Sequence, residues 1–262
     1  KNFQAMIVAN QGEVFSAGAN LMLVLLAAQE GEWDELARMV HRFQQVNLTL
    51  KYAPVPVVAA PFSRALGGGC EIPLHCARIQ ASAETYMGLV EVGVGVIPAG
   101  GGCKEMLARL KDPRRIFELI GMAKVSSSAE EARQLGYLHR ADRVSMNPNR
   151  LIGDAKALAL ALARDYAPPT RATIKVGGES AFAMMKLGAW SLRQGGYISD
   201  YDAIIAEKLA HVLSGGRLTG EQMVSEQYLL DLEREAFLSL CGNPKTQERM
   251  QVMLKTGKPL RN

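Results

Sequence analysis

The stretch VPVVAAPFSRALGGGCE, residues 55–71, sets the fold expected of this 262-residue chain. Its first part is a short apolar run bounded by prolines, which is typical of a strand buried on both faces. The triple glycine Gly67, Gly68 and Gly69 follows, and a helix is expected after it. A buried strand that leads through a turn into a helix is characteristic of α/β proteins. The stretch therefore predicts an α/β fold.

The same order of elements recurs on both sides of this stretch. Residues 3–9 predict a buried strand, and apolar residues at helical spacing predict an amphipathic helix over residues 33–50. A second pattern of strand and glycines occupies residues 79–102, and a helix is expected over residues 104–110. We expect residues 1–142 to form an α/β core.

The second half of the chain is expected to be mainly helical. Beyond Pro113 the strand signals are weak, apart from a short one near Arg143, and helix-forming residues dominate. Residues 143–262 are therefore expected to form a helical region that serves oligomerisation or docking. The pairs 168–169 (Pro-Pro) and 215–216 (Gly-Gly) are expected joints inside this region.

Composition places the chain among ordinary globular proteins. Hydrophobic residues make up 48% and charged residues 21% of the sequence. The longest apolar run, residues 21–28, is far shorter than the roughly 20 residues that cross a bilayer. The first three residues also lack the pattern of a secretory signal. We expect no membrane span and a cytoplasmic location.

Charge and cysteine spacing exclude several other classes of protein. The net charge of +4 fits an anionic ligand, but the basic residues are scattered, so nucleic acid is not an expected partner. The four cysteines show no zinc spacing, so free thiols and no metal site are expected. Structural roles are expected for the four histidines and for the cysteine next to Glu71, namely His41, His75, His139, His211 and Cys70.

Two glycine-containing segments, the turn at Gly68 and Gly69 and residues 15–21, are candidates for binding an oxyanion. A third segment, residues 93–98, begins like a dinucleotide fingerprint but carries Pro98 where the third glycine belongs, so dinucleotide binding is not expected. The turn at Gly68 and Gly69 lies between a strand and a helix, where unpaired N–H groups point outward. The segment FSAGANL, residues 15–21, has similar small residues before a helix. The alternative is that these glycines only permit tight turns.

Two glutamates stand close to these turns in the sequence. Glu71 directly follows the triple glycine, and Glu91 lies inside an otherwise apolar stretch. A carboxylate is costly to bury, so such a residue is either a partly solvated helix start or a group with a tuned pKa. General acid/base catalysis needs one group that takes a proton and another that delivers one. The pair is therefore a candidate acid/base dyad.

Three segments together resemble the enoyl-CoA hydratase, or crotonase, superfamily, and their order and spacing agree with that family over residues 3–142. The segments are FSAGANL (15–21), PVVAAPFSRALGGGCE (56–71) and YMGLVEVGVGVIPAGGG (86–102). Residues 117–138 and 236–262 are similar to the hydratase portion at the C-terminal end of bacterial 3-hydroxyacyl-CoA dehydrogenase multifunctional proteins. The resemblance implies a crotonase-like spiral of ββα units, whose first unit is expected to be missing, followed by a helical C-terminal region.

The resemblance also assigns roles to individual residues. It implies that Ala19 and Gly68 supply the two N–H groups of an oxyanion hole, and that Glu71 and Glu91 flank the catalytic water. Glu91 matches the principal proton donor and Glu71 the base that orients water. The other residues expected to contact substrate are Ala17, Gly67, Gly69 and Gly93.

The implied activity is hydration of 2-trans-enoyl-CoA to 3-hydroxyacyl-CoA in fatty-acid β-oxidation. Coenzyme A is part of the substrate, so this domain needs no cofactor, and NAD is expected only in a dehydrogenase domain outside this chain. The resemblance further implies a homo-oligomer. Family members that act as isomerases commonly lack the counterpart of Glu71, so hydratase is favoured over Δ3,Δ2-enoyl-CoA isomerase.

Departures from the family pattern leave a third alternative open. About forty residues expected before Phe3 are missing, so we expect a fragment with incomplete coenzyme A contacts. Asn20 replaces a common Asp, which matters little if the N–H of Ala19 acts. Relatives often carry basic residues after an Ala-Phe pair, whereas here Leu238, Ser239 and Leu240 follow that pair, and the lysines that can substitute are Lys245, Lys255 and Lys258. The third alternative is thus an inactive acyl-CoA-binding or assembly domain.

Overall fold

The computed structural model describes residues 3–262 and contains two compact units. The first unit comprises the described residues up to Ala19, Gln45–Leu89 and Val125–Arg171. The second comprises Asn20–Gln44, Val90–Lys124 and Ala172–Asn262. Both units are therefore assembled from separate stretches of the chain. The functional boundary expected after residue 142 stays a prediction.

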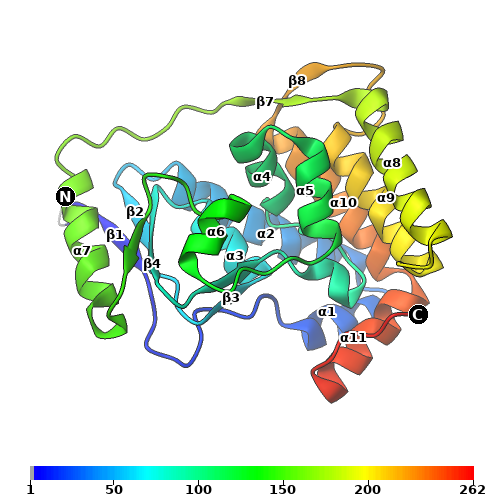
Figure 1. The fold of residues 1–262 in the computed structure, drawn as a ribbon, viewed down its shortest axis with the longest axis horizontal. Coiled ribbons are helices and arrows are strands. Elements are labelled where there is room, and N and C mark those ends of the chain that lie inside the picture. Colours follow the sequence, from blue (N-terminus) through cyan, green and yellow to red (C-terminus); the bar gives the residue numbers. More distant parts are fainter. Residues whose placement is uncertain (1–2) are drawn as a thin grey trace. The chain divides into compact units, whose positions relative to one another are not determined.

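Parallel strands form the framework of the first unit (Figure 1). Four of them are hydrogen-bonded in the order β1-β2-β4-β6, and β3 pairs with β5. Their bounds are β1 Met6–Val8, β2 Val57–Ala59, β3 Arg64–Leu66, β4 Arg78–Ser82, β5 Tyr86–Gly88 and β6 Arg143–Ser145. Parallel pairing requires crossover connections, which agrees with the alternation of strands and helices predicted from the sequence.

All three residues of strand β2 are buried. Because successive side chains of a strand point in opposite directions, both faces of β2 are buried. Val58 packs in a cluster with Leu151 and Leu158 of helix α7 (Leu151–Leu162). Val57 packs in a separate cluster with Cys76. This confirms the prediction of a two-sided buried strand. The remaining helical elements that lie wholly in this unit are α3 Gly68–Leu74, α6 Ala129–Leu135 and the 3-10 turn η2 Pro148–Arg150.

The second unit is mainly helical. Helices α8 and α9 lie side by side in it, and β7 pairs with β8 in an antiparallel ribbon (Figure 1). Its elements are α1 Leu21–Glu30, η1 Glu91–Val94, α4 Gly102–Leu110, α5 Pro113–Gly121, β7 Thr173–Val176, α8 Gly178–Gln194, α9 Asp200–Ser214, β8 Gln222–Ser225, α10 Glu226–Cys241 and α11 Pro244–Thr256. Helix α2, Trp33–Lys51, has residues in both units.

Most expected elements are present, and one pair of strands was missed. Helix α2 and the strand near Arg143 occur where the sequence predicts them. The ribbon of β7 and β8 was not expected after Pro113. Each of its strands has only four residues, and both include polar residues, so the period-2 signal is short. The expected joint at residues 168–169 lies between α7 and β7.

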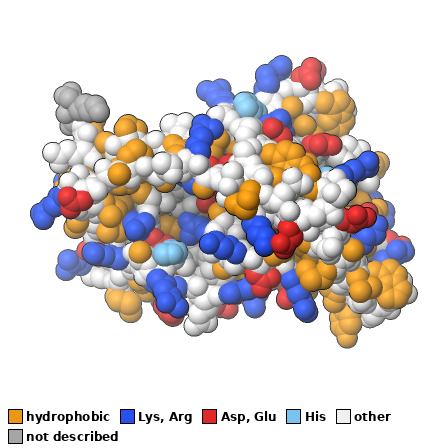
Figure 2. Space-filling view, turned by 90° about the horizontal axis from the view of Figure 1, so that it is seen from above, with side chains coloured by type: hydrophobic (Ala, Val, Ile, Leu, Met, Phe, Trp, Pro, Cys, Tyr) orange, Lys and Arg blue, Asp and Glu red, His pale blue; other side chains and the backbone are white. Residues whose placement is uncertain are grey.

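Three features bear on the expectations from composition, namely the apolar character of the helices, the charged surface and the cysteines. Among residues 3–262, no helix combines the length and the apolar character needed to span a bilayer. Basic and acidic side chains both occur on the face in Figure 2. The four cysteines, all within residues 3–262, are buried and form no disulfide. Burial raises the pKa of the Cys241 thiol to about 12, so it is uncharged and unreactive at neutral pH.

Candidate functional site

The triple glycine of the first unit forms the turn from β3 into α3. Gly67 has φ 57° and ψ −130°, a combination that only glycine adopts without strain, and its N–H donates to the Gly88 carbonyl at 2.8 Å. Helix α3 begins at Gly68, so the N–H groups of Gly68 and Gly69 precede its first backbone hydrogen bond, which runs from the Cys70 N–H to the Gly67 carbonyl at 2.7 Å. The strand-to-helix turn lies where the sequence predicted it, and the role of its N–H groups as donors to a ligand stays a prediction.

The segment around Gly18 lies directly beside this turn. Ser16 pairs with Ala65 in a parallel bridge, and its carbonyl accepts the Leu66 N–H at 3.0 Å. A Cβ placed on Gly18 would lie 3.5 Å from the nitrogen of Gly68. The two glycine-containing segments predicted from the sequence are thus brought together in the first unit. Ala17 and Ala19 flank Gly18 and are exposed.

The close approach of Ser16 to Gly69 makes a first testable prediction. A Cβ on Gly69 would meet the Ser16 carbonyl oxygen at 2.7 Å, so Gly69→Ala must push the two segments apart. We expect the free energy of unfolding to fall by about 1–3 kcal/mol in urea titrations. Gly153→Ala in α7 is the matched control, because nothing lies within 4 Å of its added methyl group. An equal change in the free energy of unfolding of Gly69→Ala and Gly153→Ala would contradict the close packing of the turn.

Glu71 occupies the first turn of α3 and is only 2% exposed. Its N–H donates to the Gly67 carbonyl at 3.1 Å, and a carboxylate at a helix N-terminus is favoured by the helix dipole. His75 places Nδ1 at 2.7 Å from the Glu71 carbonyl oxygen. Because that oxygen can only accept, Nδ1 carries the proton, and His75 has a structural contact here.

Glu91 is half-buried and begins the 3-10 turn η1 of the second unit. Its carbonyl accepts the Val96 N–H at 3.2 Å, and the turn ends at Gly95 with φ 90°. A Cβ on Gly95 would lie 2.6 Å from Oγ1 of Thr246 and 2.9 Å from its Cα. Helix α11 therefore packs so closely on the turn after Glu91 that only glycine fits at position 95.

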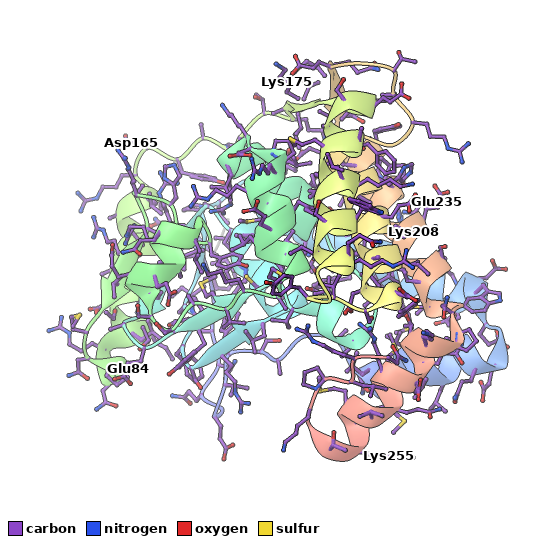
Figure 3. The ribbon with its side chains drawn as sticks, turned by 45° about the vertical axis from the view of Figure 1, so that its right-hand side comes forward. Glu84, Asp165, Lys175, Lys208, Glu235 and Lys255 are labelled. Carbon is purple, nitrogen blue, oxygen red and sulfur yellow. The ribbon has the colours of Figure 1, made fainter. Side chains whose placement is uncertain are left out.

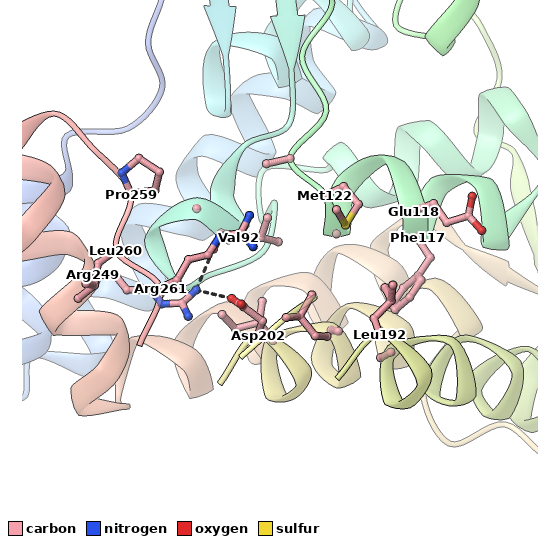
Figure 4. Close-up of a pocket in the computed structure, with 17 residues that line it drawn as sticks. Val92, Phe117, Glu118, Met122, Leu192, Asp202, Arg249, Pro259, Leu260 and Arg261 are labelled. Atoms are coloured by element: carbon pink, nitrogen blue, oxygen red, sulfur yellow. Dashed lines mark hydrogen bonds and ion pairs between the residues drawn. The ribbon is translucent and has the colours of Figure 1, made fainter. Parts of the chain in front are cut away.

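Arg249 of α11 is a buried cation beside the same turn, and 1% of it is exposed. Its guanidinium donates to Asp202 at 2.7 Å and to the Val92 carbonyl at 3.5 Å (Figure 4). Burial alone would raise the pKa of the Asp202 carboxyl, but the Ser199 N–H and the Arg249 guanidinium outweigh it and lower this pKa. The ion pair is therefore formed at neutral pH.

The lowered pKa of Asp202 predicts a pH-dependent contribution to stability. A carboxyl whose pKa is lower in the folded state stabilises the fold above its ordinary pKa of 3.8 and loses this contribution as the pH falls through its folded value. We expect Asp202→Asn to be less stable than wild type at neutral pH, with the difference shrinking at about pH 3. Urea unfolding at both pH values measures it. A difference that does not change with pH would refute the assignment.

A cavity of about 160 Å³ in the second unit adjoins the Glu91 turn (Figure 4). Its walls are mainly apolar and include side chains of α5, α8 and α9. Six of the residues that line it are Val92, Gly93, Phe117, Met122, Leu192 and Ile205. Gly93, which was expected to contact substrate, thus lines a cavity, and its contact with substrate stays a prediction.

The other sequence candidates occupy peripheral positions. Lys245, Lys255 and Lys258 are exposed, and Lys255 projects from the end of α11 in Figure 3. Their contact with a coenzyme phosphate stays a prediction. Asn20 caps α1, since its side chain accepts the Met22 N–H at 3.1 Å. An Asn directly before an apolar helical run signals this role, but the sequence interpretation did not use it.

The structure thus groups the predicted residues by unit. Ala19, Gly68 and Glu71 belong to the first unit, together with Ala17, Gly67 and Gly69. Glu91 and Gly93 belong to the second. The sharing of one ligand by the two glutamates stays a prediction. Within residues 3–262, no group of three or more His, Cys, Asp or Glu is arranged to hold a metal ion.

Comparison with known proteins identifies the family. The family model described as enoyl-CoA hydratase/isomerase matches residues 1–159. The chain belongs to the enoyl-CoA hydratase/isomerase family. The match covers the three motifs that carry the resemblance in the sequence. The recognition of the crotonase superfamily from those motifs is therefore confirmed.

Two curated relatives extend this result. The chain is 48% identical over 271 residues to a Bacillus subtilis (strain 168) protein named Probable 3-hydroxyacyl-CoA dehydrogenase, an alignment that covers 100% of the chain and 34% of that protein. It is 30% identical over 159 residues to crotonyl-CoA hydratase of Syntrophomonas wolfei, covering 60% of the chain and 56% of the relative. The chain thus spans about a third of the length of the first relative.

A solved structure shows the same fold. The crystal structure of enoyl-CoA hydratase from Bacillus halodurans matches with a TM-score of 0.63 at 19% sequence identity, covering 94% of this chain and 80% of that one. At this identity the similarity establishes the fold alone. The prediction of an α/β crotonase-like fold with a helical C-terminal region is confirmed.

Proposed function

We propose that the chain hydrates 2-trans-enoyl-CoA thioesters to 3-hydroxyacyl-CoA, as the hydratase part of a larger 3-hydroxyacyl-CoA dehydrogenase protein. The observation that carries the proposal is the packing of the Gly18 segment against the Gly68 turn, one helical turn before the buried carboxylate of Glu71. Two backbone donors next to an acid/base group suit a reaction that builds negative charge on a thioester oxygen. Family membership supports the same chemistry.

The proposed mechanism divides the work between amides and carboxylates. The N–H groups of Ala19 and Gly68 donate to the thioester carbonyl oxygen and stabilise the enolate that forms when water attacks. Glu71 takes a proton from the water, whose oxygen bonds to Cβ, and Glu91 delivers a proton to Cα. The sum is the addition of one water molecule. The two carboxyl groups titrate as a coupled pair if they share the water.

Family membership and the named relatives also support a proposal about the cofactor, the neighbouring region and the pathway. Hydration by these residues uses coenzyme A only as part of the substrate, and NAD would serve a dehydrogenase region elsewhere in the longer protein. The similarity to a protein named as a 3-hydroxyacyl-CoA dehydrogenase supports such a neighbour. We place the activity in fatty-acid oxidation in the cytoplasm and expect a homo-oligomer.

A direct assay tests the proposal. The purified protein is mixed with crotonyl-CoA and with longer 2-trans-enoyl-CoA esters, and loss of the absorbance of the conjugated thioester is followed. Mass spectrometry of the product should show the addition of one water. A folded protein that binds these esters in calorimetry without converting any of them would replace the proposal with an acyl-CoA-binding or assembly role.

A further inference from the structure

Three buried side chains form a polar network against the four residues that follow Glu91. Thr246 and Arg249 come from α11 and Tyr201 from α9, and their exposed fractions are 0%, 1% and 1%. All three belong to the second unit, as does Glu91. The mechanism proposed above gives none of them a task. A buried polar network of this kind stabilises a single conformation only if all of its hydrogen bonds are formed.

The hydrogen bonds of this network have a single consistent direction. Oγ1 of Thr246 lies 2.6 Å from the Gly95 carbonyl oxygen and 2.6 Å from the Tyr201 hydroxyl. A carbonyl oxygen only accepts, so the one proton of Thr246 goes to Gly95. Tyr201 must then donate to Thr246. Burial raises the pKa of Tyr201, which keeps this donor protonated at neutral pH.

Arg249 contacts the ring of Tyr201 and extends the network. Its guanidinium lies 5.1 Å from the centre of the Tyr201 ring and donates to the Val92 carbonyl. Its Nε also donates to the side chain of Asn262 at 2.8 Å. The carbonyls of Val92 and Gly95, one and four residues after Glu91, are thus both held by donors from α11.

The 3-10 turn has only four residues, and the i to i+3 hydrogen bonds of such a turn are less well aligned than those of an α-helix. We propose that Thr246, supported by Tyr201 and Arg249, is a positioning residue that orients Glu91 for proton delivery. This inference rests on the proposed function. It predicts an effect on the chemical step, since a misplaced catalytic group lowers kcat more than it weakens substrate binding.

Thr246→Val tests the inference with a side chain of nearly the same shape. We expect kcat for crotonyl-CoA to fall about tenfold, with KM changed by less than about twofold, and Thr246→Ser to restore kcat. Thr256→Val is the matched control in the same helix, because the Thr256 hydroxyl is exposed and donates to Val252 within α11. Its kcat should equal that of wild type. Tyr201→Phe, which removes only the donor to Thr246, should lower kcat in the same direction.

Amide hydrogen exchange of residues 91–96 supplies a readout that does not depend on turnover. Exchange there should be faster in Thr246→Val and Tyr201→Phe than in wild type and unchanged in Thr256→Val. Unchanged kcat or unchanged exchange in both network variants would overturn the positioning role while the hydratase function stood. If wild type is inactive but the exchange of residues 91–96 still responds to the substitutions, the hydratase function is overturned. The positioning role of Thr246 in catalysis falls with it, and only its ordering of the turn remains.

Discussion

Replacing Glu91 with glutamine is expected to lower kcat for hydration of crotonyl-CoA by about 10²- to 10⁴-fold. Glutamine keeps the size and hydrogen-bonding reach of the side chain but cannot deliver a proton to Cα. Binding of the ester should persist, because the thioester oxygen is held by backbone donors in this mechanism. Steady-state kinetics should therefore show a large fall in kcat with a small change in KM.

Glu84→Gln is the control for this substitution. Glu84 is exposed and projects from the surface in Figure 3, so the same chemical change there should leave kcat unaltered. The urea midpoint of each variant shows whether a loss of rate occurs in folded protein, because Oε2 of Glu91 is buried. A Glu91→Gln enzyme with kcat within about twofold of wild type would exclude Glu91 as the proton donor.

Glu71→Gln is expected to separate the two activities that the family name covers. Hydration requires a base that takes a proton from water, so loss of the Glu71 carboxylate should lower its rate by about 10²- to 10⁴-fold. Isomerisation of a 3-enoyl-CoA to the 2-enoyl ester moves a proton between carbons, and Glu91 alone can serve it. The variant should therefore lose hydration and keep any isomerisation that wild type has. Both reactions can be followed through the absorbance of the conjugated thioester.

The burial of Glu71 calls for a stability control in this experiment. Glu71 is 2% exposed, so its replacement can alter folding as well as chemistry. Circular dichroism and the urea midpoint of each variant show whether the loss of rate occurs in folded protein. If wild type isomerises 3-enoyl-CoA without hydrating the 2-enoyl ester, and Glu91→Gln abolishes that isomerisation whereas Glu71→Gln does not, the chain is an isomerase. Wild-type rates in both variants would exclude the dyad.

The local features of the site were predictable because they depend on residues that are neighbours in the chain. The proline-bounded run, the triple glycine and Glu71 lie within 17 consecutive residues, and the structure places them as β2, the turn and the first turn of α3. The resemblance added Ala19, whose neighbour Gly18 does lie against the Gly68 turn. The ribbon of β7 and β8 was missed because antiparallel pairing of two four-residue strands is decided by contacts across the ribbon.

Sequence by itself determined the α/β class and the positions of the two glycine turns, since each follows from short-range pattern. It also singled out Glu71 and Glu91 by residue chemistry, and their catalytic roles stay predictions. Only tertiary structure decided that Thr246 binds the carbonyl of Gly95, 151 residues away, and that Arg249 binds that of Val92, 157 residues away. A threonine or an arginine on a helix has the same local signal whether it faces solvent or a buried carbonyl. Its partner is chosen by the packing of whole helices, which no short stretch of sequence encodes.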